Sequence, residues 1–470
     1  MMADLVRQEI LAFDDAREAL QAALSQRTRE RSRDRNDRII RVAVAVRNID
    51  PLSWLAAQTH DVKIFWSDRT RQTEVAAVGV AAHVRGSESP GNMLDRAAAL
   101  AAAAPPNVRI YGGMAFDADA PPGDLWSAFG PAWFMLPRIE LRKRGPYCVL
   151  AYHCVVDNDA SEETPLDIAA GVIDSLRPEG PYPVFDAAGP QALTEEPNQG
   201  MWTRHVQDAL GRIRENALKK IVLARKTRVE FEHEVNGLGL LALFASHAPK
   251  SSLFYMRPAR GVAFLGASPE RLYRRRGRLI ETEAVAGTRP RSLDPEMDRV
   301  LGEQLLTNAK EQREHKLVIE AIRHGLSILC ESFDGDSTMR VLRLRECQHL
   351  YASLTGRLQK NISDSRILRV LHPTPAVGGC PTQEALAVIR HMESFSRGWY
   401  AGPVGWMSRD AAEFAVAIRS ALITGKRLHI FAGAGIVEGS VAEREWAELD
   451  TKMGTFHHLF AGNHGRRAES

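Results

Sequence analysis

The sequence predicts an α+β fold in which β-sheets pack against each other. Short runs of β-type composition, bounded by turn residues, occur in both halves of the 470-residue chain, and helical patterns separate them. No Pro/Gly/Ser-rich linker divides the halves, and a hydrophobic content of 44% suffices for one large core or two ordinary ones. Together these observations favour one fused domain.

The chain begins with an amphipathic pattern over residues 4–24, which predicts a helix. The segment from Arg27 to Arg38 then alternates charge without an apolar anchor, so we expect a solvated helix end or a connector. A nucleic-acid-binding arm is less favoured, because no aromatic residue is interleaved with the arginines. We therefore expect an N-terminal helix and charged connector over residues 1–38 and a single domain over residues 39–462.

The single domain has two β-rich parts, residues 39–195 and residues 196–462. In the first part strands are expected near 39–46, 62–66, 73–81, 107–117, 132–142 and 147–156, with one helix over 92–104. In the second part strands are expected near 220–231, 252–257, 262–267, 271–282 and 427–435. Helices are expected there near 202–218, 236–246, 294–331, 382–390 and 441–458.

Charge, cysteine content and hydropathy exclude several classes of protein. The 61 basic and 58 acidic residues leave a net charge of +3, which does not favour nucleic acid or another polyanion as a partner. Five cysteines without paired C-x-x-C spacing argue against a disulfide framework and a structural zinc site, so a reducing cytoplasm is the expected location. No export signal and no run of about 18 apolar residues is visible, so we expect a soluble protein without a membrane partner.

Two Glu-x-x-Glu pairs, Glu311/Glu314 and Glu445/Glu448, carry the strongest chemical signal. At helical spacing the first pair continues an apolar stripe that includes Val318, instead of opposing it. Unpaired carboxylates are costly to bury, whereas a hard divalent cation such as Mg²⁺ accepts their oxygens and offsets that cost. The pattern predicts a metal-dependent enzyme.

Lys220 and Glu270 are candidates for proton transfer. Lys220 leads into a buried-looking strand, and desolvation lowers a lysine pKa from about 10.4 toward the range in which the neutral amine acts as a base. Glu270 leaves a tight turn whose Ser-Pro step fixes its direction, as suits a proton donor. Each also has a simpler interpretation, which is a snorkelling surface lysine for the first and an ion pair with Arg271 for the second.

Further residues have the chemistry of an anion-binding pocket. The Gly287-Thr288 turn offers backbone N–H groups and a hydroxyl to an anion. Gly433 and Gly435 end a strand but lack the third glycine of a dinucleotide-binding motif, so a nest for a substrate carboxylate is favoured. Arg419 has the fork geometry that grips a carboxylate, with a structural ion pair as the alternative.

A rigid loop of small residues, from His372 to Pro381, is expected to wall a pocket around a compact ligand. Tyr400, in a Gly-rich segment, would add a hydroxyl. Cys380 lies in the loop without a charge pattern that would lower its pKa, so a packed thiol is favoured over a nucleophile.

Seven segments of the chain, in this order, carry a family resemblance: KIVLAR, FLGASPERL, TEAVAGTRPR, AKEQREHKLVIE, HPTPAVGG, RGWYAGPVGW and AGAGIVEGSVAEREWAE. They resemble segments of the chorismate-utilising enzymes, which include isochorismate, salicylate, anthranilate and aminodeoxychorismate synthases. Upstream segments such as NIDPLSWLAAQ and WFMLPRIEL look like the longer isochorismate synthases of the menaquinone pathway. The resemblance implies the chorismate-binding fold of anthranilate synthase component I, a large β-sandwich flanked by helices with the substrate in a central cleft.

By that resemblance Lys220 would be the general base that activates water, and Glu270 the general acid that protonates the departing C4 hydroxyl. Water would add at C2, so that chorismate and isochorismate interconvert. The positions that match or adjoin the family's Mg²⁺ ligands are Glu311, Glu314, Glu445 and Glu448. The substrate-contacting positions would be Gly287, Thr288, His372, Ala376, Val377, Tyr400, Arg419, Gly433, Gly435 and Lys452.

Two positions in the sequence distinguish between the functions of the family. Anthranilate synthases resemble a pattern with another residue at the position of Lys220 and with Gly-Thr where this chain has Ala376-Val377, so water is favoured over ammonia. Many isochorismate synthases have Ala-Leu there. The favoured function is a Mg²⁺-dependent isochorismate synthase of menaquinone biosynthesis, acting on chorismate as a monomer or homodimer. The alternatives are a salicylate synthase, which goes on to eliminate pyruvate, a siderophore-pathway isochorismate synthase, and a noncatalytic binding subunit.

Overall fold

The computed structural model describes residues 9–31, 39–86, 88–121, 123–155, 165–185, 190–345, 347–454 and 456. These residues contain eleven α-helices and 19 strands, which confirms the expected α+β class. All 19 strands belong to one hydrogen-bonded sheet with antiparallel pairing between neighbours. The separate sheets expected from the sequence are therefore two wings of a single sheet.

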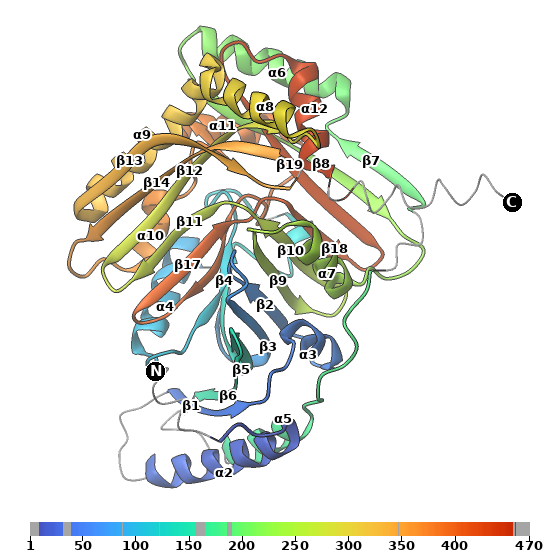
Figure 1. Ribbon diagram of the computed structural model, residues 1–470, viewed down its shortest axis with the longest axis vertical. Helices are drawn as coiled ribbons and strands as arrows, with labels where there is room; N and C mark the ends of the chain where they lie inside the picture. Colours follow the sequence, from blue (N-terminus) through green and yellow to red (C-terminus); the bar gives the residue numbers. More distant parts are fainter. Residues whose placement is uncertain are drawn as a thin grey trace, which may run out of the picture.

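The wings separate at β5 (Ala132–Arg144), a strand that pairs with three others. Along its length it contacts β3 (Thr73–Val84), β4 (Ile110–Met114) and β6 (Tyr147–Val155). β6 in turn pairs with β1 (Ile39–Val46). The first β-rich part of the sequence thus supplies the base from which both wings extend (Figure 1).

We call the two extensions the β19 wing and the β12 wing. The β19 wing runs in the order β3, β2 (Lys63–Ser67), β9 (Ser252–Ala259), β10 (Val262–Ser268), β18 (Ser420–Thr424), β19 (Arg427–Ile436), β8 (Lys220–Glu230) and β7 (Ala192–Glu196), and the two-residue β15 (Gly379–Cys380) also pairs with β8. The β12 wing runs in the order β4, β16 (Pro403–Met407), β17 (Ala411–Val416), β11 (Arg271–Arg276), β12 (Leu279–Pro290), β14 (Cys347–Leu358) and β13 (Cys330–Arg343). Figure 1 shows the two wings splayed to opposite sides of their common base.

Helices pack on the outside of this framework. Around the base and the β19 wing these are α3 (Pro51–Ala57), α4 (Pro90–Ala103), α5 (Pro165–Asp174) and α7 (Gly237–His247). At the far end of the wings, around β8, β19 and β12, lie α6 (Gln199–Arg214), α8 (Pro295–Thr307), α9 (Ala309–Leu329), α11 (Thr382–Met392) and α12 (Ala442–Lys452), and α10 (Asp364–Leu371) packs beside α4 and α9 (Figure 1). Among the described residues no helix is long and apolar enough to cross a membrane.

The N-terminal helix differs from its predicted range. Residues 1–8 lie outside the described part of the chain, and α2 covers Phe13–Arg31 instead of residues 4–24. It begins late because Leu11 forms backbone hydrogen bonds with Ala45 and Arg47 at the edge of β1, which holds the preceding backbone extended. At its other end the helix continues into the charged segment. The rest of the predicted connector, residues 32–38, is outside the described residues.

The long helix expected over residues 294–331 is two helices, which is a second correction. The backbone N–H of Asn308 closes α8 on Gln304, and its side-chain oxygen accepts hydrogen bonds from the N–H groups of Lys310 and Glu311 at the start of α9. Asparagine is a favoured N-cap because its side chain replaces the missing helical acceptor. The break at Asn308 therefore fixes where the first Glu-x-x-Glu pair begins.

Candidate active site

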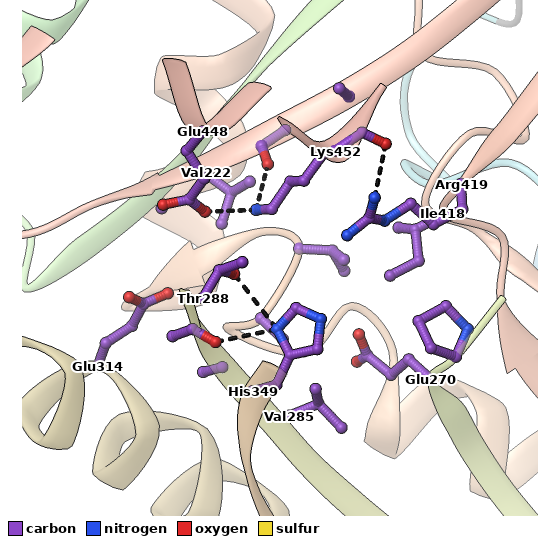
Figure 2. A pocket seen from close by; sticks show the side chains of 18 of the residues that line it. Val222, Glu270, Val285, Thr288, Glu314, His349, Ile418, Arg419, Glu448 and Lys452 are labelled. Atoms are coloured by element: carbon purple, nitrogen blue, oxygen red, sulfur yellow. Dashed lines mark hydrogen bonds and ion pairs between the residues drawn. The ribbon is translucent and has the colours of Figure 1, made fainter. Parts of the chain in front are cut away.

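A cavity lies between the two wings at the end that the helices cover. The β19 wing supplies Val222, Phe431, Ala432, Gly433 and Gly435 to its lining, and the β12 wing supplies Val285, Ala286, Gly287, Thr288 and His349. The helices and loops add Glu314, Ala376, Val377, Tyr400, Glu448 and Lys452. Figure 2 shows carboxylates, an imidazole and a guanidinium around this space, drawn from elements far apart in the sequence.

Two of the links by which the chain passes between the wings form the floor of the cavity. The first link joins β10 to β11 and carries Pro269 and Glu270, and the second joins β17 to β18 and carries Ile418 and Arg419. They are tied together because the backbone N–H of Ala267 donates to Arg419 O at 3.1 Å. Backbone hydrogen bonds are obligatory in such buried segments, so both links are held rigidly.

Glu270 lies on the first link with only 5% of its surface exposed. Its backbone N–H donates to Ser268 Oγ, and its carbonyl accepts from the N–H of Val416 on the second link, at 3.2 and 3.1 Å. Burial disfavours the charged carboxylate and, although Lys220 opposes this, raises the pKa of Glu270 to about 7. A carboxyl group in this state holds a proton near neutral pH and is able to donate it into the cavity.

Lys220, the first residue of β8, has no exposed surface. Its Nζ lies 2.8 Å from Oε1 of Glu314, which is the cavity-lining carboxylate of α9. It does not itself line the cavity, because β19 stands beside it: a Cβ placed on Gly435 would be 3.1 Å from Lys220 Cε and 2.6 Å from Glu314 Oε1. Glycine at 435 is what allows the lysine, the glutamate and the strand to meet.

The second cavity-lining carboxylate, Glu448 of α12, also pairs with a lysine. Lys452 Nζ lies 2.7 Å from Glu448 Oε1, one helical turn away, and donates to Gly433 O at 2.8 Å (Figure 2). Burial is the largest single influence and opposes ionisation, but the charge and hydrogen bond of Lys452, together with the charges of Lys310 and His349, outweigh it and lower the pKa of Glu448. Glu448 is therefore an anion at the cavity wall.

The remaining members of the two Glu-x-x-Glu pairs are not among the residues that line the cavity. Glu311 pairs with Arg289 at 2.9 Å, and Glu445 pairs with Lys310 at 2.6 Å. Burial, reinforced by the neighbouring Glu314 and Glu448 respectively, raises the pKa of both carboxyls. In the described ranges no three His, Cys, Asp or Glu side chains stand close enough to form a ready-made metal site.

Arg419 lies where the resemblance expected a carboxylate-binding residue. Its Nη1 donates to Lys452 O at 2.6 Å, and its backbone has φ of +53°, a left-handed conformation that is unfavourable for a residue with a side chain. Tyr400, which stacks on Phe431 with ring centroids 5.1 Å apart, also lines the cavity. The described contacts thus hold a guanidinium and a phenol at the same cavity.

The structure brings most of the other expected substrate-contacting residues to this cavity. Gly287, Thr288, Ala376, Val377, Gly433, Gly435 and Lys452 all line it. His372 does not: its Nε2 is hydrogen-bonded to Phe116 O at 3.0 Å, and burial lowers the pKa of its imidazole to about 4. A ring held neutral against a carbonyl in the first β-rich part supports the loop, so His372 lies outside the lining where a substrate contact was expected.

His349 and Cys347 of β14 belong to the site and were not expected there. His349 lines the cavity, and its Nδ1 is 2.9 Å from Gly287 O and 3.3 Å from Thr288 Oγ1 (Figure 2). Cys347 lies beside it, with Sγ 3.3 Å from His349 Nε2. The only signal in the sequence was the spacing of two residues, which places both side chains on one face of a strand.

Comparisons with known proteins agree with this site. The profile of a family described as "Chorismate binding enzyme" matches residues 19–461. Isochorismate synthase 2 of Arabidopsis thaliana, a chloroplastic protein, is 35% identical over 75% of this chain, and the chain spans 64% of its length. The salicylate biosynthesis isochorismate synthase of Pseudomonas aeruginosa is 36% identical over 73% of this chain and 72% of its own length.

A solved structure shows the same architecture. The menaquinone-specific isochorismate synthase MenF of Escherichia coli superposes with a TM-score of 0.81 and 32% sequence identity. The match covers 94% of this chain and 99% of that one. The fold implied by the motif resemblance, including both β-rich parts, is confirmed by this match.

Proposed function

Because the chain belongs to the chorismate-binding enzymes, we propose that it is a Mg²⁺-dependent isochorismate synthase that adds water at C2 of chorismate and releases the C4 hydroxyl. The observation that carries the proposal is Glu270: a buried carboxyl with a pKa of about 7 on the floor of a cavity that also presents Arg419 and Lys452. Hydroxide is a poor leaving group at neutral pH, so the reaction needs such an acid.

Glu270 is the proposed general acid. Its backbone is fixed through Ser268 and Val416, so the carboxyl is held in one direction while it delivers its proton to the departing oxygen. Positioning of this kind lowers the barrier because the proton donor is in place before the bond breaks. In the reverse reaction the same carboxylate takes the proton back from the water that adds at C4.

Lys220 is the proposed general base, and the structure sets a condition on that role. While its ammonium pairs with Glu314 at 2.8 Å, it is charged and holds no lone pair for a proton. The amine can act as a base only when the pair opens and the proton leaves. Gly435 leaves the space in which that rearrangement takes place.

The carboxylates at the cavity fit a hard divalent cation. Glu314 and Glu448 face the same space from two helices, and repulsion from these two groups adds to the raised pKa of Glu311 and Glu445. Glu314 and Glu448 would hold Mg²⁺, with Glu311 and Glu445 behind them. When bound, the ion anchors a substrate carboxylate and withdraws charge from the conjugated ring. Arg419, Tyr400 and Lys452 are left to orient the rest of the substrate.

Product analysis tests the function. Purified protein is incubated with chorismate and Mg²⁺, with ammonium in a parallel tube and with a chelator in a third, and products are separated by chromatography. We expect isochorismate in the first two tubes and no turnover in the third. Formation of salicylate and pyruvate would show that the protein is a salicylate synthase instead. Formation of anthranilate would show that it aminates chorismate. The absence of product in every tube would favour a noncatalytic binding subunit.

Menaquinone biosynthesis is the proposed pathway. The near-complete coverage in both directions of the MenF match supports it, and the similarity to a salicylate-pathway enzyme keeps that pathway as the second candidate. The reducing cytoplasm inferred from the cysteine content, and a monomer or homodimer, complete the proposal. Complementation of a bacterial strain that lacks its menaquinone-specific isochorismate synthase separates an isochorismate synthase from a salicylate synthase, because rescue requires release of isochorismate.

A further inference from the structure

The sulfur of Cys347 lies between two positively chargeable groups at the edge of the cavity. Sγ is 3.3 Å from His349 Nε2 and accepts a hydrogen bond from Arg419 Nη2 at 3.5 Å. Both partners line the cavity proposed to bind chorismate, whereas Cys347 lies one layer behind them and is only 3% exposed. The sulfur therefore connects an imidazole and a guanidinium that face the same space.

The partner of the other imidazole nitrogen fixes the hydrogen-bond direction. Gly287 O accepts from His349 Nδ1 at 2.9 Å, and a carbonyl can only accept, so Nδ1 carries the hydrogen. In the neutral ring Nε2 then presents its lone pair to the sulfur. A thiol next to a base that is itself oriented by a third group is the arrangement of an activated nucleophile.

The charges around Cys347 favour the thiolate. Burial raises its pKa, but the charges of His349, Arg419 and Lys452 outweigh burial and lower it to about 6. Among the residues that the structure describes, Arg291, from the loop before α8, and His247 and Arg345, which line the adjoining cavity, are further titratable or charged groups nearby. Burial instead raises the pKa of Cys148, Cys330 and Cys380, so these thiols stay protonated at neutral pH.

A second cavity gives access to the sulfur from behind. Cys347 lines it together with Phe244, Pro249 and Leu344, and it shares Pro269, Arg419 and Lys452 with the first cavity. Arg419 and Lys452 thus form a partition between the two spaces. A small neutral molecule in the second cavity reaches the thiol without passing through the substrate site.

We propose that Cys347 is a positioning residue that holds Arg419 and His349 against the substrate cavity, and that its sulfur is a modification site for small electrophiles that thereby weaken substrate binding. The labelling part stands on the geometry alone, and the binding part rests on the proposed function. Removal of the sulfur's negative charge frees the guanidinium that is proposed to grip the substrate carboxylate.

Iodoacetamide is a suitable probe, and its reaction balances simply. The Cys347 thiolate attacks the methylene carbon, a C–S bond forms, and the C–I bond breaks as iodide leaves with the electron pair. The proton that the thiol gave up passes from His349 to solvent. The product is an uncharged thioether, which no longer holds Arg419 as an ion pair does.

Site mapping by mass spectrometry tests the nucleophile. Wild-type protein and the control Cys380→Ser, which removes the most exposed of the five thiols, are treated with iodoacetamide at pH 7. We expect Cys347 to be labelled at least about 10-fold faster than any other cysteine in the folded protein, because the charges beside its sulfur favour the reactive thiolate at that pH. If Cys347 were labelled no faster than the other cysteines, the proposed modification site would be contradicted, whether or not the protein turns over chorismate.

Steady-state kinetics test the positioning role. We expect Cys347→Ala to raise the KM for chorismate about 10-fold while kcat changes less than about threefold, since the lost contact is one charge-assisted hydrogen bond. Cys347→Ser, which still accepts from Arg419, should lie between wild type and Cys347→Ala and should resist iodoacetamide. An unchanged KM in Cys347→Ala, or a parallel loss of kcat and melting temperature, contradicts positioning. Absence of turnover in untreated wild type would instead contradict the proposed function.

Discussion

The helices α9 and α12 present the same short motif to the cavity in two different ways. Each places one glutamate at the lining, Glu314 or Glu448, and each of these pairs with a lysine at nearly the same distance, 2.8 and 2.7 Å. The lysine of the first pair comes from strand β8 and is fully buried, whereas the lysine of the second comes from the same helix and is 20% exposed.

That difference separates two kinds of ion pair. Water replaces a lost partner at the exposed pair of α12, so the pair contributes about 0–1 kcal/mol and opens easily. No solvent reaches Lys220, so loss of either charge leaves the other without compensation, at about 3–5 kcal/mol. The buried pair is therefore the one that responds strongly to the loss of a partner, and the more exposed pair is suited to holding a ligand.

The largest expected effect separates the two lysines. Lys220→Met should lower kcat about 10³-fold, as loss of a general base does, whereas Lys452→Met should mainly raise the KM for chorismate, by about 10-fold. Steady-state kinetics at saturating Mg²⁺ measure both. Thermal melts provide the control, because only Lys220→Met should also lose stability.

Equal kinetic effects of the two substitutions would contradict the distinction between the pairs. If Lys220→Met retained wild-type kcat with an intact melt, the proposed base would be another group. Lys220→Arg sharpens the result: it restores the charge near Glu314 but not a titratable amine, so stability should return without activity.

The next effect follows from the burial of Glu270 and appears in the pH dependence. Its pKa of about 7 means that the proton donor is lost as pH rises, so kcat/KM should fall about tenfold per pH unit above 7. In Glu270→Gln turnover should drop at least about 10²-fold at every pH. A wild-type profile that stays flat to pH 9 would contradict the assignment of the acid.

Replacement of Glu270 should raise stability even though it lowers activity, because the buried carboxyl costs stability once it ionises. The folded pKa lies above the ordinary value of 4.5, so between pH 4.5 and 7 the folded state binds a proton that the unfolded state does not, and stability decreases as pH rises through that window. The cost above pH 7 amounts to at most about 3 kcal/mol. Glu270→Gln should therefore melt higher than wild type at pH 8 and at a similar temperature at pH 4.5, as measured by calorimetry.

A smaller effect is expected from the two glycines that adjoin the lysines. A Cβ at position 435 would stand 2.6 Å from Glu314 Oε1, and one at 433 would stand 2.9 Å from the Tyr400 hydroxyl. Gly435→Ala should displace the buried pair and lower kcat about 10-fold, whereas Gly433→Ala should act mainly on KM. Kinetics of both variants decide this, and an effect on KM alone in Gly435→Ala would contradict it.

The smallest effect is expected for Glu311 and Glu445, which do not line the cavity and which we call the outer pair. Glu311→Gln and Glu445→Gln leave Arg289 and Lys310 partly exposed to water, so each should raise the Mg²⁺ concentration for half-maximal activity less than about fivefold. Glu314→Gln and Glu448→Gln should raise it more than about 10-fold, since they remove proposed ligands. Magnesium titrations of the four variants test the order, and a larger effect from the outer pair would reverse the assignment of the ligands.

The Glu-x-x-Glu pairs could be predicted as site residues from the sequence because their spacing does not fit an ordinary surface helix. Glu311 follows the stripe of Val318, Ile322 and Leu329, and all four are buried in α9. The buried Lys220 at the start of a strand and the glycines at 433 and 435 carried similar local signals. Such residues can be recognised in the sequence because each conflicts with the pattern of its own neighbours along the chain.

Other parts of the site depend on contacts that no local pattern contains. The β13–β14 hairpin was not predicted, because charged and apolar residues mix in it. Cys347 and His349 lie in this hairpin and were therefore not predicted as site residues. His372 shares its loop with two lining residues but turns to Phe116, some 250 positions earlier in the chain. Arg69, from the first β-rich part, pairs with Glu283, whose charge acts on Glu270. These long-range contacts require the fold.

The links that carry Glu270 and Arg419 have a consequence for how the enzyme is made. Strand β8 pairs with β19, about 200 residues later, and each link closes only when both wings are in register. On the ribosome the sheet around β8 therefore stays incomplete until β19 has emerged. Activity should arise in a single late step of synthesis, and two fragments divided within either link should regain it only by reassembling the whole sheet.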